Sequence, residues 1–155
     1  MRKSIDKILG RLLVLLMAFM VLSVLWQITS RYVLSSPSSF TEELSRFLFI
    51  WVGILGAAYA SGKRNHLAIT ILPGKLNPEQ RRLLYIFINI LIILFGIGVM
   101  IIGGANLVYV NYSLGQYSAA LGLPLSLIYS IVPVSGILVV YYKLDEIINS
   151  KKYLI

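Results

Sequence analysis

The chain consists of long apolar stretches separated by short groups of charged and turn-forming residues. No Asp, Glu, Lys or Arg lies between Arg11 and Arg31, between Arg46 and Lys63, or between Arg82 and Lys143. A transmembrane helix needs about 20 apolar residues, because the hydrocarbon core of a bilayer is about 30 Å thick. The first two stretches therefore each predict one helix, and the third is long enough for two.

The third stretch is divided by NYSLGQYSAALGLP, residues 111–124, where turn-forming residues gather between two apolar runs. Transmembrane helices are thus predicted at about residues 12–34, 42–62, 83–112 and 124–142. Inside a bilayer, backbone polar groups can be hydrogen-bonded only in a helix or a closed barrel. The apolar runs are continuous and lack the alternating pattern of a barrel strand, so helices are predicted. The predicted fold class is an all-α integral membrane protein, with residues 1–155 as a single four-helix membrane domain.

Short local signals refine these helices. Asn77 followed by Pro78 favours the start of the third helix, because Pro at the first helical position loses no hydrogen bond. Ser39 and Glu42 have the spacing of a capping box at the start of the second helix. Pro133 removes one backbone hydrogen bond and predicts a bend in the fourth helix.

Charge is distributed unevenly between the two sides of the predicted bundle. The chain has 14 Lys and Arg residues against 6 Asp and Glu, a net charge of +8. When the helices alternate in direction, every basic residue except Arg31 and Arg46 falls on one side. The positive-inside rule makes that side cytoplasmic, together with both termini, and leaves residues 31–41 and 113–123 outside. Apolar residues among the charges of residues 64–81 predict a segment that lies on the cytoplasmic membrane face, in contact with lipid.

The first residues, MRKSIDKILGRLLVLLMAFMVLSVLWQ, also resemble a signal peptide, with a basic start followed by an apolar run. There is no convincing cleavage site of small residues, and apolar character continues to Leu34. We therefore expect an uncleaved first helix whose first turns lie along the cytoplasmic interface. Tyr85, Tyr141 and Tyr142 are predicted near the same interface, where aromatic side chains are enriched.

The residues that catalysis or metal binding would require are scarce. The chain has no Cys and a single histidine, His66, beside Lys63 and Arg64 at a membrane surface. No nucleophile with its base, no phosphate-binding glycine loop and no metal-ligand spacing is present, so we predict no enzyme, no cofactor and no metal site. The basic residues flank apolar spans and form no RNA-binding signature, which excludes nucleic acid as a predicted partner. A self-contained transporter would need ionisable groups inside the bilayer, and the predicted spans place none in its interior, away from their outer ends.

Small residues mark possible contact faces between helices. Gly53, Ala57 and Ser61 lie at helical spacing on the second helix, where small side chains let another backbone come close. Internal packing among the four helices and a face for a different protein both explain this pattern. The third helix repeats it at Gly96, Gly98, Gly103 and Gly104.

The stretch TEELSRFLFIW, residues 41–51, places two acids and one Arg at the start of the second helix. Glu42 precedes Arg46 by four residues, the favoured orientation for a helical ion pair. Helix initiation accounts for Glu42, but it does not account for Glu43 and Arg46 further along the helix, or for Arg31 at matching depth on the first helix.

Residues 26–60, WQITSRYVLSSPSSFTEELSRFLFIWVGILGAAYA, resemble the signature region of a known family. This is the small membrane subunit, of the DctQ type, of tripartite ATP-independent periplasmic (TRAP) transporters. The resembling elements are an aromatic residue and Gln before Ser-Arg-Tyr, a short Ser/Pro loop, Thr-Glu-Glu-Leu with an Arg, then Phe-Ile-Trp and Gly-Ala-Ala. His66 and the Leu-Pro pair at residues 72–73 also fit.

The resemblance implies a three-part transporter in the bacterial inner membrane. A periplasmic binding protein captures an organic acid such as a dicarboxylate or sialic acid, and a large membrane subunit carries it inward, driven by sodium that binds to the large subunit. The small subunit packs against the large one and stabilises it. Residues implied at the anchoring or subunit interface are Arg31, Glu42, Glu43, Arg46, Trp51, Gly53 and Ala57, the four charged ones as a polar cluster at the outer end of the first two helices. A second hypothesis is that the outer residues Tyr112, Gln116 and Tyr117 help to dock the periplasmic protein.

The alternative is a self-contained four-helix transporter or channel that acts as a homo-oligomer. It requires the purified chain alone to move a solute across a liposome membrane.

Overall fold

A computed structural model describes residues 2–63 and 77–148 of the chain. Its helices are α1 (Arg2–Tyr32), α2 (Ser39–Gly62), α3 (Pro78–Phe95), the π-helical segment η3 (Gly96–Gly103), α4 (Gly104–Ser113), α5 (Leu125–Tyr129) and α6 (Ile131–Ile148). The elements α3, η3 and α4 form one continuous third helix, and α5 and α6 form the fourth. The predicted all-helical fold with four long apolar helices is confirmed, and each is long and apolar enough to cross a membrane. The segment predicted on the membrane face between the second and third helices, with His66, lies outside the described residues.

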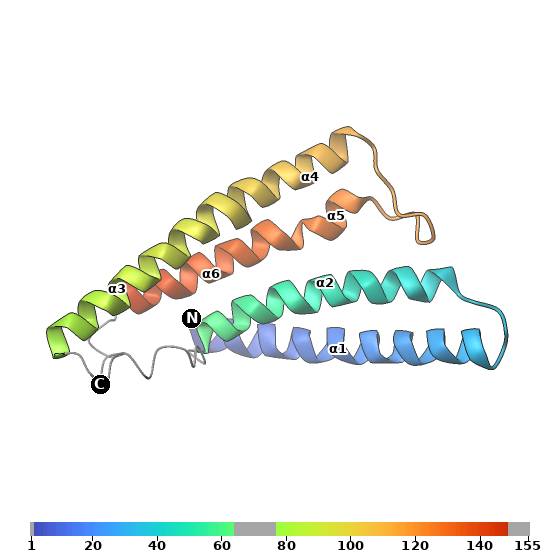
Figure 1. Ribbon diagram of the computed structural model, residues 1–155, viewed down its shortest axis with the longest axis horizontal. Coiled ribbons are helices and arrows are strands. Elements are labelled where there is room, and N and C mark those ends of the chain that lie inside the picture. Colours follow the sequence, from blue (N-terminus) through green and yellow to red (C-terminus); the bar gives the residue numbers. More distant parts are fainter. Residues whose placement is uncertain (1, 64–76, 149–155) are drawn as a thin grey trace.

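The helices lie side by side in one layer, in the order α1, α2, α6, α3 (Figure 1). The main contacts of α1 are with α2, those of α2 are with α1 and α6, and α6 also packs against α3 and η3. We call the end of the layer that holds Arg2 and Ile148 the terminal end. The opposite end, with residues 33–38 and 114–124, is the loop end, and there the two helical hairpins diverge (Figure 1).

The ends of the helices follow local chemistry. Asn77 precedes α3 and Pro78 begins it, as predicted. The predicted capping box at α2 is wrong, because the cap is Ser38, whose Oγ accepts the Thr41 N–H at 3.4 Å. Ser38 has an extended backbone that aims its hydroxyl at the first turn, whereas Ser39 is already helical. The fourth helix is interrupted at Ser130, close to the Pro133 that predicted a bend.

Glycines allow the third and fourth helices to touch. A Cβ at Gly136 would lie 2.7 Å from Met100 Cβ, and one at Gly96 would lie 2.9 Å from Val140 Cγ2. Gly104 packs against Pro133 in the same way, with its added Cβ 2.9 Å from Pro133 Cδ. Close backbone approach is how helices gain dispersion contacts in lipid, where no hydrophobic force drives them together.

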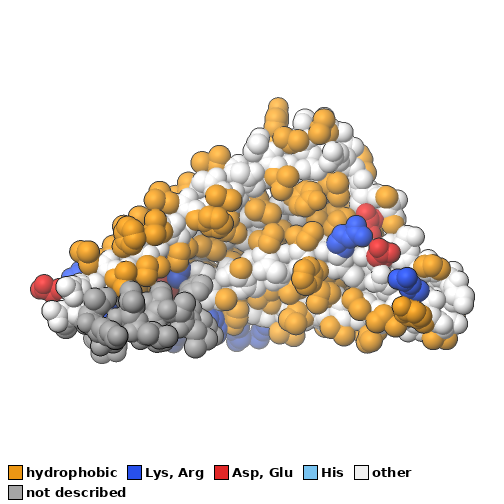
Figure 2. Space-filling view, in the orientation of Figure 1, with side chains coloured by type: hydrophobic (Ala, Val, Ile, Leu, Met, Phe, Trp, Pro, Cys, Tyr) orange, Lys and Arg blue, Asp and Glu red, His pale blue; other side chains and the backbone are white. Residues whose placement is uncertain are grey.

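A single layer leaves much of the surface of its helices without an intrachain partner. The buried apolar residues of the described chain are Leu9, Leu55, Ala58, Ile128, Ile131, Val139 and Tyr142. Apolar side chains are spread over much of the visible face (Figure 2), and many large ones along all four helices are exposed. A water-soluble protein rarely exposes such an area, so lipid or other subunits must cover these faces.

Candidate functional site

At the loop end, the carboxylate of Glu43 holds the connection between the third and fourth helices. Its oxygens accept hydrogen bonds from Ser118 Oγ at 2.9 Å and from the backbone N–H groups of Ala119 at 3.2 Å, Ala120 at 2.7 Å and Leu121 at 3.0 Å. Hydrogen bonds to an ionised acceptor are roughly twice as strong as neutral ones. Glu43 therefore ties α2 to a loop more than 70 residues further along the chain.

The loop itself is a compact turn rather than an open connection. Tyr117 and Pro124 form an isolated antiparallel bridge, and Ser118 N donates to Leu123 O at 2.8 Å. Gly115 and Gly122 have positive φ angles of 58° and 64°, which glycine adopts without steric cost. The turn points three successive amides toward one carboxylate, an arrangement that favours an anion.

Removing the charge of Glu43 should release this loop without unfolding the helices. In a Glu43→Gln variant, we expect the amides of residues 119–121 to exchange hydrogen about ten to a hundred times faster, since a charged hydrogen bond contributes about 1.5–3 kcal/mol. Hydrogen exchange followed by mass spectrometry measures this. Glu42→Gln is the matched control and should leave the exchange unchanged. Equal exchange in Glu43→Gln and the parent chain would contradict the role of Glu43.

The other predicted charged residues lie nearby but do not form one cluster. Arg46 Nη2 is 3.3 Å from Glu42 Oε1, and both side chains are more than half exposed. The guanidinium of Arg31 stacks over the ring of Tyr32 at 5.7 Å, and no described contact joins it to the charges of α2. A small group of charged side chains stands out among apolar ones at this end (Figure 2).

Trp51 joins the two hairpins near the break in the fourth helix. Its indole Nε1 donates to the carbonyl oxygen of Ile128 at 3.0 Å. A break in a helix leaves some backbone carbonyls without their helical hydrogen bond. A buried carbonyl without a partner is costly in lipid. Trp51 thus supplies a partner where the regular helical ladder of α5 and α6 is interrupted.

One strip of α2 has no partner within the described chain. Its residues follow helical steps of three or four along one face: Glu42, Arg46, Phe49, Gly53 and Ala57. We call it the α2 strip. Phe49 is 68% exposed, and a Cβ added at Gly53 would meet no atom within 4 Å. Of the small residues predicted as a contact face, Ser61 is buried in the chain, whereas Gly53 faces outward.

The residues predicted to dock a periplasmic protein lie on the surface of the loop end. Tyr112 is 75% exposed and Tyr117 is 66% exposed, and Gln116 is exposed between them. These three residues share the rim of a small cavity of about 180 Å³. Glu43 holds the same loop, so one residue of the predicted interface group also positions the predicted docking residues.

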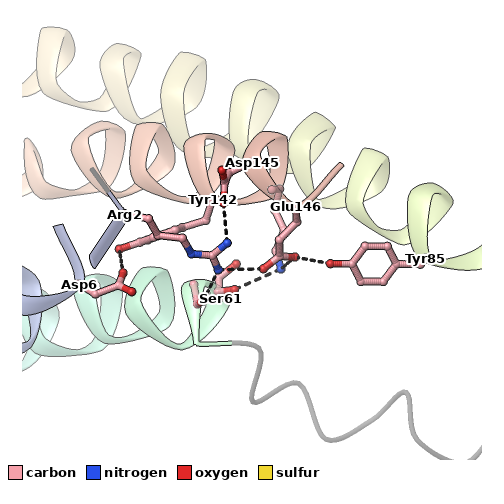
Figure 3. Close-up of polar contacts among 9 residues, drawn as sticks. Arg2, Asp6, Ser61, Tyr85, Tyr142, Asp145 and Glu146 are labelled. Atoms are coloured by element: carbon pink, nitrogen blue, oxygen red, sulfur yellow. Dashed lines mark hydrogen bonds and ion pairs between the residues drawn. The ribbon is translucent and has the colours of Figure 1, made fainter. Parts of the chain in front are cut away.

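At the terminal end, a network of charged and polar groups joins all four long helices (Figure 3). Arg2 of α1 bridges α2 and α6, with Nη1 2.7 Å from Asp145 Oδ2 and Nη2 3.4 Å from Glu146 Oε1. The same guanidinium donates to the carbonyl of Gly62 at 2.6 Å. This one side chain of α1 therefore contacts two other helices, α2 and α6.

Glu146 lies at the centre of the network and is 1% exposed. Its Oε2 accepts from Lys143 Nζ at 3.0 Å and from the Tyr85 hydroxyl of α3 at 3.0 Å. Lys143, 3% exposed, also donates to the carbonyl of Ser61 at 3.2 Å. The carboxylate thus has donors from α1, α3 and its own helix.

Tyr142 completes the contact between α1 and α6. Its hydroxyl donates to Asp6 Oδ1 at 2.7 Å, and the Arg2 guanidinium lies 5.5 Å from its ring centre. The ring is fully buried against Gly62, where an added Cβ would lie 2.8 Å from it. Apolar helices slide easily in lipid, so these directional contacts set the register between the hairpins.

Sequence reasoning missed this network, because it placed Lys143 and the acids after it outside the fourth span. Tyr85 and Tyr142, which were predicted near the interface, donate hydrogen bonds to Glu146 and Asp6. The available signal was the spacing: Arg2 and Asp6 are four residues apart, Lys143 and Glu146 are three apart, and each pair shares a helix face. What the sequence could not supply was the partner helix.

Within residues 2–63 and 77–148, no group of His, Asp and Glu side chains is arranged to hold a metal ion. The polar contacts are interhelical ties rather than a reaction centre. Residues 20–152 match the family described as Tripartite ATP-independent periplasmic transporters, DctQ component. The chain belongs to this family. It is a TRAP transporter small permease subunit, a transmembrane transporter component and not an enzyme.

Curated relatives within the TRAP family are similar along most of the chain. The sialic acid TRAP transporter small permease protein of Vibrio cholerae is 33% identical, covering 100% of this chain and 88% of that protein. The ectoine TRAP transporter small permease protein of Halomonas elongata is 26% identical over 97% of this chain and 82% of that protein. The C4-dicarboxylate TRAP transporter small permease protein of Rhodobacter capsulatus is 30% identical over 64% of this chain and 44% of that protein. A tripartite system implies a large permease and a periplasmic binding protein as the other two components.

Proposed function

We propose that this chain is a non-transporting brace of a sodium-coupled TRAP transporter in a bacterial inner membrane. It packs against the large transport subunit and stabilises it during the uptake of an organic acid. Sodium and substrate bind to the other subunits. The named substrates of the relatives differ in chemistry, which supports a role for this chain that is independent of substrate.

The observation that carries this proposal is the α2 strip. It combines an ion pair, an exposed aromatic ring and a small-residue surface along one helix face with no partner in the described chain. Small residues are favoured where membrane helices meet, since they allow backbones to approach. We infer that a helix of the large subunit lies along Gly53 and Ala57, with Trp51 holding α2 in position behind them.

The distribution of buried charge supports a static role. Among the described residues, the buried ionisable groups gather at the terminal end and are paired with one another. Ion and substrate pathways instead place ionisable groups along a route across the membrane. A subunit whose buried charges hold its own helices together is suited to hold another subunit in place.

The orientation follows from the distribution of basic residues. We propose that the terminal end faces the cytoplasm, because every Lys and Arg except Arg31 and Arg46 lies there or in the segments connected to it. The loop end then faces the periplasm, and Tyr112, Gln116 and Tyr117 can contact the binding protein. Inserting a charge within residues 113–118 should slow uptake while leaving complex assembly intact.

Replacing Arg46 by Ala should reduce recovery of the complex. The variant leaves Glu42 unpaired on the α2 strip, and we expect about threefold to tenfold less large subunit to accompany the tagged chain from native membranes. Mass spectrometry of the pull-down identifies and quantifies the partner. Arg82→Ala, an exposed change at the terminal end, is the control. Normal assembly and uptake with Arg46→Ala would contradict an interface role for this residue.

The same pull-down distinguishes the proposal from the self-contained transporter. A large polytopic membrane protein in stoichiometric amount supports the brace. Recovery of the chain alone as a homo-oligomer that moves solute in liposomes would support the alternative and overturn the proposal.

A further inference from the structure

An open groove of about 790 Å³ lies between α1 and α2 at the terminal end, beside the polar network. Its lining changes along its length. Lys3, Lys7 and Arg11 of α1 and Lys63, the residue that follows α2, line one part, and Val14 and Leu15 line the other. The groove therefore passes from a cationic zone to an apolar zone.

The cationic zone has a surplus of positive charge. None of its four cations forms an ion pair with a residue that the structure describes. Asp6, the acid in the groove lining, already accepts the Tyr142 hydroxyl at 2.7 Å. Lys63 lies 5.2 Å from the ring of Tyr59, which leaves its ammonium group directed along the groove wall. The lining therefore carries four positive charges against the one negative charge of Asp6, and this surplus favours an external anion.

Gly10 shapes the floor of the groove. A Cβ at this position would lie 3.2 Å from the hydroxyl of Tyr59, tighter than an ordinary contact. The absence of a side chain lets the tyrosine of α2 lie close against α1 and keeps the space above it open. The groove thus has an aromatic wall at the level of Gly10, within the cationic zone, and tyrosine is enriched at membrane interfaces.

The two zones of the groove lie at positions along α1 that match the headgroup and hydrocarbon layers of a bilayer. Residues 12–30 of α1 span about 28 Å at 1.5 Å per residue, close to the roughly 30 Å of a hydrocarbon core. Lys3, Lys7 and Arg11 then lie at headgroup depth, about 6 Å apart, while Val14 and Leu15 lie at the depth of the first acyl carbons. The cationic and apolar zones coincide with the two chemical zones of a phospholipid.

We propose that this groove binds one anionic phospholipid. Lys3, Lys7, Arg11 and Lys63 surround its phosphate, and an acyl chain lies along Val14 and Leu15. The lipid lies against both α1 and α2 at the end of their hairpin. The proposed lipid site requires only that the chain is inserted in a membrane. It does not require the partner subunits, and it does not depend on the direction of transport.

Native mass spectrometry of the full-length chain in detergent tests the site, with added dioleoylphosphatidylglycerol or dioleoylphosphatidylcholine as the probe. We expect the anionic lipid to bind at least fivefold better. A Lys7→Gln/Arg11→Gln variant should reduce its occupancy about tenfold, since each basic residue near an anionic headgroup contributes to the attraction. Arg81→Gln/Arg82→Gln removes the same charge at the same end but outside the groove, and should bind as the parent chain does. Lys7→Arg/Arg11→Lys retains charge and should also bind normally, which separates loss of the site from loss of the fold.

Three outcomes would overturn the proposal. Equal binding of the two lipids would mean an apolar groove without headgroup selection. An equal loss with the control variant would mean attraction by overall charge. Displacement of the lipid by excess inorganic phosphate would mean a site for a free anion and not for a lipid.

Discussion

Replacing Glu146 by Gln should lower the free energy of unfolding by about 3–5 kcal/mol, the cost of leaving a buried charge without its partner. Lys143 and Arg2 both direct charged donors at this carboxylate, and the Tyr85 hydroxyl is a third donor. For a chain of this length, each kcal/mol corresponds to about 2–4 °C in Tm. Thermal unfolding in detergent should therefore show a decrease of about 10 °C.

Two further variants identify the cause of that decrease. Glu42→Gln removes one carboxylate from an exposed pair and should change stability by less than about 1 kcal/mol. Lys143→Met/Glu146→Leu removes the buried pair together and should recover at least half of the lost stability, because apolar replacements of similar size often offset such a pair. If the double variant were less stable than Glu146→Gln, the network would stabilise through more than charge pairing.

Replacing Gly53 by Leu should abolish recovery of the large subunit while the chain itself folds normally. An added Cβ at Gly53 meets no atom within 4 Å, so the leucine causes no clash inside the chain. Against a closely packed partner helix, the same side chain costs about 1–3 kcal/mol of overpacking, which corresponds to a loss of affinity of about fivefold to 150-fold. Co-purification measures assembly, and the Tm of the isolated chain measures the fold.

Gly98→Leu is the matched control, because Gly98 of η3 also has no atom within 4 Å of an added Cβ. It should leave both assembly and Tm unchanged. Normal assembly of Gly53→Leu would place lipid rather than the large subunit against the α2 strip. A decrease in assembly with both variants would point to a general effect on membrane insertion.

The sequence predicted that polar contacts form at the loop end, but it did not predict which residues make them. The cluster of charges at the start of α2 stands out against the apolar spans, and it predicted polar contacts at this end. The sequence could not show that Glu43 bonds to residues 118–121, because that contact depends on how the third and fourth helices place their connecting turn. It also could not separate Arg31 from Glu42 and Arg46, since helical spacing says nothing of the distance between two helices.

Glycines illustrate the same limit. Gly53, Gly96, Gly98, Gly103 and Gly104 all matched a pattern of close helix contact. Gly96 and Gly104 pack against the fourth helix, whereas Gly53 and Gly98 face open space. A small side chain permits a close approach from any side, so the pattern cannot tell which helix, or which protein, makes use of it.

The sequence by itself determined that the chain forms four long apolar helices, where the third one begins and roughly where the fourth one is interrupted. It could do so because these features depend only on residues close together in the sequence. An apolar run favours transfer into lipid, a Pro favours a helix start, and a Pro within a helix removes a backbone hydrogen bond. Tertiary structure alone decided that the helices form one layer, that Arg2, Lys143 and Glu146 meet in a buried network, and that the α2 strip has no intrachain partner. Lipid and helix surfaces are almost equally apolar, so the order of the helices depends on a few directional polar contacts between residues distant in sequence.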